Sequence, residues 1–217
     1  MAERLITLNT IQAALDLRHF DAAAAQEPMM PGSRSRNLPS NGKNSRQAGV
    51  LLLLYPLADE LHFVLTRRTE TLRGHSGQVS FPGGRRDPED DTLIDTALRE
   101  THEELGIWNP DMHILGNLTP IYIPPSNFEV FPTVAALDEV PEFQPNPAEV
   151  AQVFSVPVGA LLDDDFKRVE HWPFNGNQVR IPFYAFNDHK VWGATAIMLS
   201  EFEGRLRAVL PQDMPQK

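Results

Sequence analysis

Cysteine is absent from the 217 residues of this chain. Its absence excludes disulfide bonds, thiolate metal sites and cysteine nucleophiles, and it fits a reducing compartment. Long apolar runs are also lacking, since no stretch approaches the roughly 18 residues that a membrane-spanning helix needs. The first residues, MAERLITLNT, lack the basic-then-apolar order of a signal peptide. We therefore expect a cytoplasmic protein that has no membrane partner.

Basic residues are scarce beside acidic ones. The chain has 19 Lys and Arg against 29 Asp and Glu, which gives a formal net charge of −10. A nucleic-acid-binding surface needs a basic stripe that displaces counterions from phosphates, so this balance argues against nucleic acid as a partner. With 41% hydrophobic residues, the chain can bury one good core. A single domain with an added N-terminal arm is expected.

Acidic residues gather on a predicted helix within the segment FPGGRRDPEDDTLIDTALRETHEELGI, residues 81–107. In a 3.6-residue period Glu100 and Glu104 lie one turn apart on one stripe, and Glu103 lies beside them. Like charges at this spacing destabilise an isolated helix, so a purely structural helix gains nothing from them. A hard divalent cation would turn the repulsion into chelation, and oxygen-only ligands favour Mg²⁺ or Mn²⁺ over zinc.

Other positions of this segment predict how the helix begins, ends and packs. Asp90 or Asp91 is expected to cap its start ahead of Thr92, and Gly106 to end it. Arg99 precedes the first glutamate and can orient or partly neutralise the cluster. The opposite face is apolar at Ile94, Ala97, Leu98, Thr101 and Leu105. An acidic run is also common on a solvated helix face, so this pattern by itself leaves both interpretations open.

Arginines precede the acidic helix at five positions: Arg67, Arg68, Arg73, Arg85 and Arg86. Guanidinium groups bind phosphate oxygens bidentately, while metal ions neutralise charge on a scissile pyrophosphate. A site that combines the two suits a polyphosphate substrate. The alternative is an ordinary strand edge and loop with solvated arginines. His75, in the same loop, could bind a phosphate or serve the loop structurally.

The segment from Gly84 to Ile107 resembles the Nudix box, G-x5-E-x7-R-E-U-x-E-E-x-G-U, in which U is aliphatic. The matching residues are Gly84, Arg99, Glu100, Glu103, Glu104, Gly106 and Ile107. The separation from Gly84 to Arg99 is one residue longer than usual, and the first glutamate of the box is replaced by Asp90 or Asp91. Thr101 stands where an aliphatic residue is usual.

The preceding segment, LTRRTETLRGHSGQVSFPGG, is similar to the signature L-L-T-x-R-S/A-x3-R-x3-G-x3-F-P-G-G of the coenzyme A pyrophosphatase branch of Nudix hydrolases. The matching residues are Leu65, Thr66, Arg68, Arg73, Gly77, Phe81, Pro82, Gly83 and Gly84. The resemblance implies an α/β fold, a Nudix-type α/β/α sandwich with a mixed central sheet. The expected domain spans residues 48–210, after an N-terminal helical arm and polar linker over 1–47 and before a tail over 211–217.

The resemblance also implies an activity, the metal-dependent hydrolysis of the pyrophosphate bond of coenzyme A or a derivative to 3′,5′-ADP and 4′-phosphopantetheine. Another nucleoside diphosphate derivative such as ADP-ribose is the alternative substrate, and a non-catalytic nucleotide sensor is a second alternative. Homodimerisation is expected from the family.

Roles for individual residues follow from the same resemblance. Mg²⁺ or Mn²⁺ would be held by Glu100, Glu103, Glu104, the Gly84 carbonyl and Glu149. Glu100 and Glu103 are candidate general bases, Glu149 and Glu142 are alternatives from a later loop, and Arg99 orients the group. From the basic block and its loop, and not from the resemblance alone, the substrate is expected to be bound by Arg68, Arg73, His75 and Arg85.

Apolar periodicity predicts the remaining elements. Strands are expected over residues 48–55, 61–66, 114–123 and 128–136, and a hairpin over 168–172 and 179–185. A short helix is expected over 157–162. A last helix is expected over 193–209, with Ala196, Leu199, Phe202 and Leu206 on its inner face. One or two short helices are expected within residues 4–25.

Overall fold

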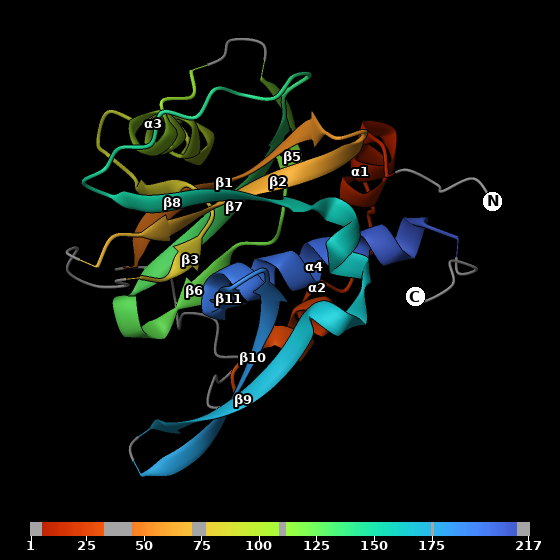
Figure 1. Ribbon diagram of the computed structural model, residues 1–217, viewed down its shortest axis with the longest axis vertical. Coiled ribbons are helices and arrows are strands. Elements are labelled where there is room, and N and C mark those ends of the chain that lie inside the picture. The colour runs from red at the N-terminus through yellow and green to blue at the C-terminus, as the bar shows by residue number, and fades with distance from the viewer. Residues whose placement is uncertain (1–5, 33–44, 71–76, 109–111, 175, 212–217) are drawn as a thin grey trace.

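The computed structural model describes residues 6–32, 45–70, 77–108, 112–174 and 176–211. In this part of the chain a mixed β-sheet lies between the helices α3 and α4, and a smaller sheet lies beyond α4 (Figure 1). The predicted α/β class with a mixed central sheet is confirmed. None of the helices in the described ranges has both the length and the apolar character needed to cross a membrane.

The main sheet is assembled around β1 (Arg46–Leu57), which is parallel to β7 (Phe128–Ala136) and antiparallel to β2 (Glu60–Arg68). Its other strands are β3 (Val79–Ser80), β4 (Gly83–Arg85), β5 (His113–Asn117), β6 (Ile121–Ile123) and β8 (Val150–Pro157). A parallel pair needs a long crossover, and the segment between β1 and β7 contains α3 (Leu93–Leu105). This crossover places the acidic helix on the sheet.

The strand predicted over residues 114–123 is wrong in one respect, because it is divided into β5 and β6. Pro120 lies between the two strands. Proline has no N–H to donate to a neighbouring strand, which disfavours a continuous ladder there. Both pieces still pair with β7, so the sheet order is kept.

Strand β1 is buried on both faces, as its continuous apolar run predicts. Leu51, Leu53 and Tyr55 pack on the α3 side, in a cluster that includes Ala97 of the helix. Leu52 and Leu54 point the other way and belong to the larger core beneath the sheet. Because successive side chains of β1 point to opposite faces of the sheet, this one strand contributes to both hydrophobic clusters.

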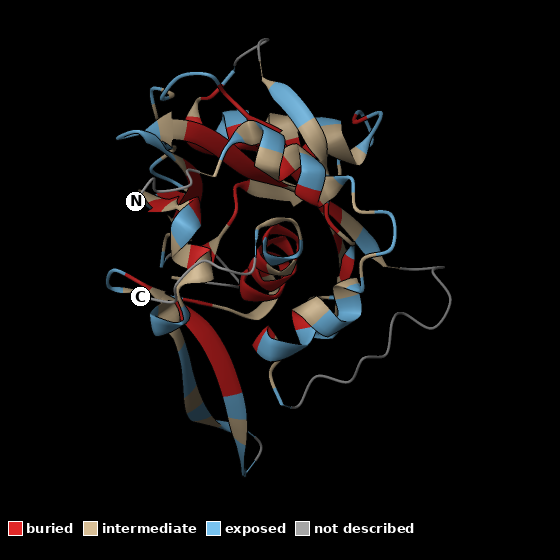
Figure 2. Cartoon of the chain, turned by 90° about the vertical axis from the view of Figure 1, so that its right-hand side faces the viewer, coloured by how far each residue is buried: buried red, intermediate tan, exposed pale blue. Residues whose placement is uncertain are grey.

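Helix α4 (Gly193–Val209) lies on the other face of the sheet, with the predicted bounds. The four residues predicted for its inner face are all buried. Figure 2 looks along this helix and shows that most of it is buried, not only one stripe. The reason is that the arm helices α1 (Leu8–Leu15) and α2 (Ala22–Gln26) also pack against it.

Buried polar contacts tie the arm to α4. The Glu201 carboxylate is fully buried and accepts hydrogen bonds from Gln26 Nε2 at 2.8 Å and from Arg205 Nε at 2.9 Å. Arg205 Nη1 donates to the carbonyl of Ala14 at 3.4 Å. Burying these groups is tolerated because each finds a partner. Strand β1 begins at residue 46, and the division of the chain at residue 47 stays a prediction.

A three-stranded sheet completes the fold, with β9 (Lys167–Phe174), β10 (Asn177–Phe186) and β11 (His189–Trp192). The hairpin of β9 and β10 is the predicted one, and it extends away from the rest of the protein (Figure 1). The short strand β11 was not foreseen. The described part of the chain also contains four 3₁₀ helices, in the connections between other elements: η1 (Glu27–Met29), η2 (Pro124–Ser126), η3 (Val158–Leu162) and η4 (Asp164–Phe166).

Helix α3 lies unusually close to β1. A Cβ atom added to Gly49 would lie 2.3 Å from the Leu93 carbonyl oxygen and 2.9 Å from the Ala97 nitrogen. Both atoms belong to the helix backbone and cannot rotate aside. The missing side chain of Gly49 thus sets the distance between the helix and the sheet.

We expect Gly49→Ala to destabilise the protein by roughly 1–3 kcal/mol, since the added methyl group overpacks this contact. Urea denaturation monitored by circular dichroism would measure the change. Gly159→Ala is the matched control, because a Cβ there meets nothing within 4 Å. Equal stability of the two variants would contradict the close packing of α3 on β1.

Candidate active site

Helix α3 begins with a reciprocal cap. Thr92 Oγ1 accepts from the Asp95 N–H at 3.1 Å, and the Asp95 carboxylate accepts from the Thr92 N–H at 2.8 Å. The prediction that Asp90 or Asp91 caps the helix is wrong, because Thr92 is the N-cap and its side chain accepts from the Asp95 N–H. The predicted end is confirmed, since Gly106 is the C-cap in the left-handed conformation with φ 70°.

The division of α3 into an apolar and an acidic face is less sharp than the sequence predicts. Ala97, Thr101 and Leu105 are buried, whereas Ile94 and Leu98 are only partly buried. Glu104 is itself buried, with 2% exposure. Thr101 replaces the usual aliphatic residue without an unpaired hydroxyl, because its Oγ1 donates to the Ala97 carbonyl at 2.7 Å.

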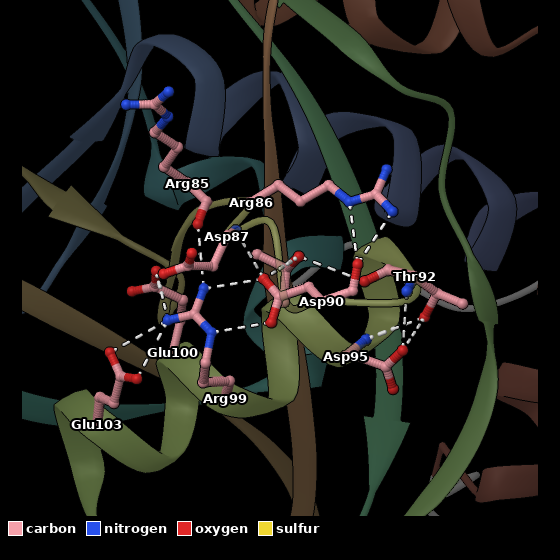
Figure 3. Close-up of polar contacts among 10 residues, drawn as sticks. Arg85, Arg86, Asp87, Asp90, Thr92, Asp95, Arg99, Glu100 and Glu103 are labelled. Carbon is pink, nitrogen blue, oxygen red and sulfur yellow. Dashed lines mark hydrogen bonds and ion pairs between the residues drawn. The ribbon is translucent and has the colours of Figure 1, made fainter.

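Arg99 is the centre of the ion-pair network on this helix (Figure 3). Its Nη1 lies 3.0 Å from Glu100 Oε1 and 3.1 Å from Glu103 Oε1. Its Nε and Nη2 each lie 3.0 Å from a carboxylate oxygen of Asp90. Nη2 also donates to the carbonyl of Arg85 at 3.1 Å. One guanidinium therefore holds three carboxylates and the strand β4 together.

Asp90, and not Asp91, is the acidic residue beside Arg99. Its side chain is buried, and it also accepts from Thr96 Oγ1 at 2.8 Å and the Asp87 N–H at 2.9 Å. The hydrogen bonds from Arg99 lower the pKa of Asp90 most, and those from Asp87 and Thr96 add to them, against the opposing effect of burial. Asp91 is exposed. The longer spacing of the box is thus absorbed in the loop before the helix.

Glu104 is the least compensated carboxylate of the cluster. Its Oε1 lies 3.5 Å from Arg68 Nη1, and its Oε2 accepts a long hydrogen bond of 3.4 Å from the Gly83 N–H. Burial raises the pKa of Glu104 to about 8, although Arg68 and Gly83 act in the opposite direction. The negative charges of Glu100 and Glu149 add to the increase. An additional cation would favour ionisation here.

Glu100 lies against Gly84 of strand β4. A Cβ on Gly84 would lie 2.4 Å from Glu100 Cδ, so a larger residue at position 84 would displace the carboxylate. Burial raises the pKa of Glu100, while Arg99 lowers it and the charges of Glu103 and Glu149 raise it further. The glycine therefore makes room for the acidic side chain.

The predicted substrate-binding residues lie in different settings. Arg68 is partly exposed and contacts Glu104. Arg85 is exposed, and its guanidinium points away from the acidic side chains (Figure 3). Arg73 and His75 fall outside the described residues. Arg86 stabilises the loop instead, since its Nη2 donates to the carbonyls of residues 90 and 91 at 3.0 and 2.8 Å.

The later loop also reaches the acidic helix. The charge of Glu149 raises the pKa of both Glu100 and Glu104, which places it within electrostatic range of them. Asn146 joins the two segments, because its N–H donates to the Glu104 carbonyl at 2.9 Å and its Nδ2 to Glu149 Oε1 at 3.4 Å. The sequence interpretation missed Asn146, although the pair Asn146-Pro147 is a turn signal.

The donor set of this cluster fits a hard divalent cation, because every candidate ligand is an oxygen. Within the described ranges, however, no group of three acidic or histidine side chains is arranged to hold a metal ion. Glu100 and Glu103 face Arg99 instead. A bound cation would stabilise the ionised form of Glu104 and so lower its raised pKa.

A family model of the NUDIX domain matches residues 45–176, more than half of the chain, and the chain belongs to this family. It is thus a Nudix hydrolase with the Nudix α/β/α fold, an enzyme that cleaves pyrophosphate bonds in small-molecule nucleoside diphosphate derivatives. Enzymes of this class generally use divalent metal ions. The expected family and enzyme class are confirmed, against the alternative of a non-catalytic sensor.

Two relatives illustrate the similarity. The chain is 39% identical over 158 residues to an uncharacterised Nudix hydrolase NudL of Photorhabdus laumondii, covering 73% of this chain and 83% of that protein. It is 37% identical over 165 residues to the mitochondrial coenzyme A diphosphatase NUDT8 of Homo sapiens, covering 74% and 69%. Among solved structures, a Nudix hydrolase from Alicyclobacillus acidocaldarius has a TM-score of 0.46 at 22% identity, over 56% of this chain and 83% of that one.

The Asp90–Arg99 pair should contribute measurably to stability. We expect Asp90→Asn to lower the free energy of unfolding at pH 7 by about 1–3 kcal/mol, since it removes charge-assisted hydrogen bonds from a buried carboxylate. The exposed control, Asp91→Asn, should change it by less than about 0.5 kcal/mol. Denaturant titration of both variants gives the comparison. The reverse ranking would assign the outer acidic position to Asp91.

This contribution should depend on pH in a defined direction. The Asp90 pKa is lowered in the folded state from an ordinary value of 3.8, so the folded protein prefers the ionised form. The stabilisation is therefore complete above about pH 4 and is lost as the pH falls further. The difference between the wild type and Asp90→Asn should shrink when the titration is repeated in acid.

The effect of Glu104 on stability should have the opposite pH dependence to that of Asp90. Its pKa rises from 4.5 to about 8 on folding, so the folded, metal-free protein holds this proton more tightly than the unfolded chain. Ionisation then costs stability as the pH rises between those two values. In EDTA, the wild type should lose stability relative to Glu104→Gln over that range. The exposed control Glu139→Gln should follow the wild type, and parallel curves for wild type and Glu104→Gln would refute the raised pKa.

Proposed function

We propose that this chain hydrolyses the pyrophosphate bond of coenzyme A or a derivative, with Mg²⁺ or Mn²⁺ as the divalent ion. Water would attack one phosphorus of the linkage, and the bond from that phosphorus to the bridging oxygen would break. The products would be 3′,5′-ADP and 4′-phosphopantetheine, with the atoms of one water shared between them. The alternative substrate is another nucleoside diphosphate derivative such as ADP-ribose.

Similarity to proteins named as coenzyme A diphosphatases carries this proposal. The human and mouse NUDT8 proteins are 37% and 35% identical to this chain over 165 and 153 residues. The aligned residues cover 74% and 69% of this chain. The LTRRTETLRGHSGQVSFPGG segment, similar to the signature of the coenzyme A branch, supports the same substrate.

The geometry supports the reaction type independently of the substrate. Arg68 lies at the buried carboxylate of Glu104, so the arginine proposed to bind phosphate is adjacent to a glutamate proposed to bind the metal. The expected roles of Arg68, Arg73, His75 and Arg85 in holding phosphates stay predictions. Arginine is suited to this task because its planar fork matches two phosphate oxygens.

We assign the divalent ion to Glu100, Glu103, Glu104, the Gly84 carbonyl and Glu149. The ion would supply a positive charge that polarises the phosphoryl group and lowers the pKa of bound water. Arg99 now neutralises Glu100 and Glu103, and we expect it to keep Asp90 as its partner when those carboxylates turn to the ion. Glu100, Glu103 and Glu149 are the candidate bases that would take the proton from water.

Purified protein should cleave coenzyme A in the presence of Mg²⁺ or Mn²⁺ and not in EDTA. Glu103→Gln and Glu104→Gln should each lower kcat by more than about 100-fold, since changes that only support metal ligands already cost 10- to 100-fold. Mass spectrometry of the products would measure both effects. Glu139→Gln is the control, because Glu139 is exposed and lies outside the cluster.

The substrate is decided in the same assay with a panel of compounds. Cleavage of ADP-ribose with no cleavage of coenzyme A would replace the proposed substrate while keeping the reaction. Unchanged turnover in both glutamine variants would instead remove the assignment of the metal to these carboxylates.

A cytoplasmic location and a homodimer also stay predictions.

A further inference from the structure

Asn146, a half-buried loop residue between β7 and β8, forms hydrogen bonds through both its main chain and its side chain. Its N–H donates to the carbonyl of Glu104, the buried glutamate of α3, at 2.9 Å. Its own carbonyl accepts from the N–H groups of Glu149 and Val150 at 3.0 and 2.8 Å. Both main-chain groups of this residue thus join the end of α3 to the start of β8.

The side chain of Asn146 makes a third connection. Its Oδ1 accepts from the Ala148 N–H at 3.1 Å, which closes an Asx turn. A main-chain N–H can only donate, so this bond fixes which end of the amide is oxygen. The Nδ2 group then points toward Glu149 and lies 3.4 Å from its Oε1.

These contacts relate two carboxylates that belong to separate elements. Glu104 is on α3 and Glu149 precedes β8, and the charge of Glu149 affects both Glu104 and Glu100. The main chain at residue 149 is held a second time, because its carbonyl accepts from the Thr69 N–H at 2.9 Å. The backbone is therefore fixed without the Nδ2 bond, which acts on the carboxylate alone.

A purely structural role in the loop would not require the Nδ2 group of Asn146. The Asx turn uses only Oδ1, and aspartate or serine could supply that acceptor equally well. The amide Nδ2 is the atom that the turn leaves free, and it reaches a carboxylate of the proposed metal site. A donor to one oxygen of a ligand restricts its rotation and leaves the other oxygen available.

We propose that Asn146 is a positioning residue that holds the Glu149 carboxylate toward Glu100 and Glu104 by donating from Nδ2. The inference rests on the proposed function, in which Glu149 acts at the divalent ion. Removing the donor should leave Glu149 free to turn into solvent, without removing any group that touches the ion or the substrate.

A double-mutant cycle with Glu149→Gln tests this proposal. Asn146→Ser keeps a side-chain acceptor for the turn and loses the amide Nδ2 group that bonds Glu149, and it should weaken Mn²⁺ binding by about 10-fold, as expected for a residue that orients a ligand. Electron paramagnetic resonance of free Mn²⁺ measures this without a substrate. In the Glu149→Gln background, Asn146→Ser should cause no further loss. Asn117→Ser is the matched control, since Asn117 is exposed and bonds Thr133 away from the cluster.

The outcomes separate a positioning role from a structural one. An equal loss in both backgrounds, no loss from Asn146→Ser, or no effect of Glu149→Gln itself would each overturn the proposal. Asn146→Asp keeps the turn and places a carboxylate against Glu149, so it should lower kcat at least as far as Asn146→Ser, with KM little changed. Wild-type turnover by Asn146→Asp would also overturn it.

Stability and substrate are controlled separately. Urea denaturation should show similar unfolding for Asn146→Asp and the wild type, so that lost activity is not lost folding. If the wild type cleaves no coenzyme A, the proposed substrate is wrong. The double-mutant cycle measured by Mn²⁺ binding still tests the role of Asn146 in that case, because it needs no substrate. A coupled cycle supports the positioning role in either case.

Discussion

The close approach of α3 to the strands beneath it is the constraint on which the site depends. Gly49 lets the helix backbone rest on β1, and Gly84 leaves room for the Glu100 carboxylate against β4. A side chain at position 49 would push the helix outward, and one at position 84 would displace the Glu100 carboxylate. Because the helix lies so close, its carboxylates meet the Gly83 N–H and Arg68 across a few ångströms, in a setting where desolvation strengthens charge interactions.

Repulsion among the acidic side chains is balanced unevenly. Arg99 compensates Asp90, Glu100 and Glu103 with short contacts, whereas Glu104 is buried and its side-chain contacts with the described residues Arg68 and Gly83 are long. The same helix thus carries two carboxylates paired closely with Arg99 and one buried carboxylate whose pKa is raised to about 8. A divalent ion would stabilise most the carboxylate that the protein's own cations neutralise least. The raised pKa of Glu104 therefore favours metal-dependent chemistry at this cluster.

Much of the fold follows from patterns that are local in sequence. The bounds of α4 and the burial of β1 were predictable, since long apolar runs and 3.6-residue periods allow few alternatives. The predicted helix cap was wrong because Asp90 and Thr92 are both good caps by residue type, and in the structure the Asp90 carboxylate bonds Arg99 and Thr96 instead. The split of β5 from β6 and the short β11 were missed, because strands of a few residues carry little periodic signal.

By itself, the sequence determined the family, the acidic helix and the oxygen-only chemistry of its glutamates, because these depend on residue type and spacing along one element. Only the tertiary structure decided that Asp90 is the partner of Arg99, that Glu104 is buried and that Arg86 serves the loop. It also brought Asn146 and Glu149 to the helix from a segment about 40 residues away. Contacts of this kind depend on how the strands and the loop are packed, and spacing along the chain does not encode them.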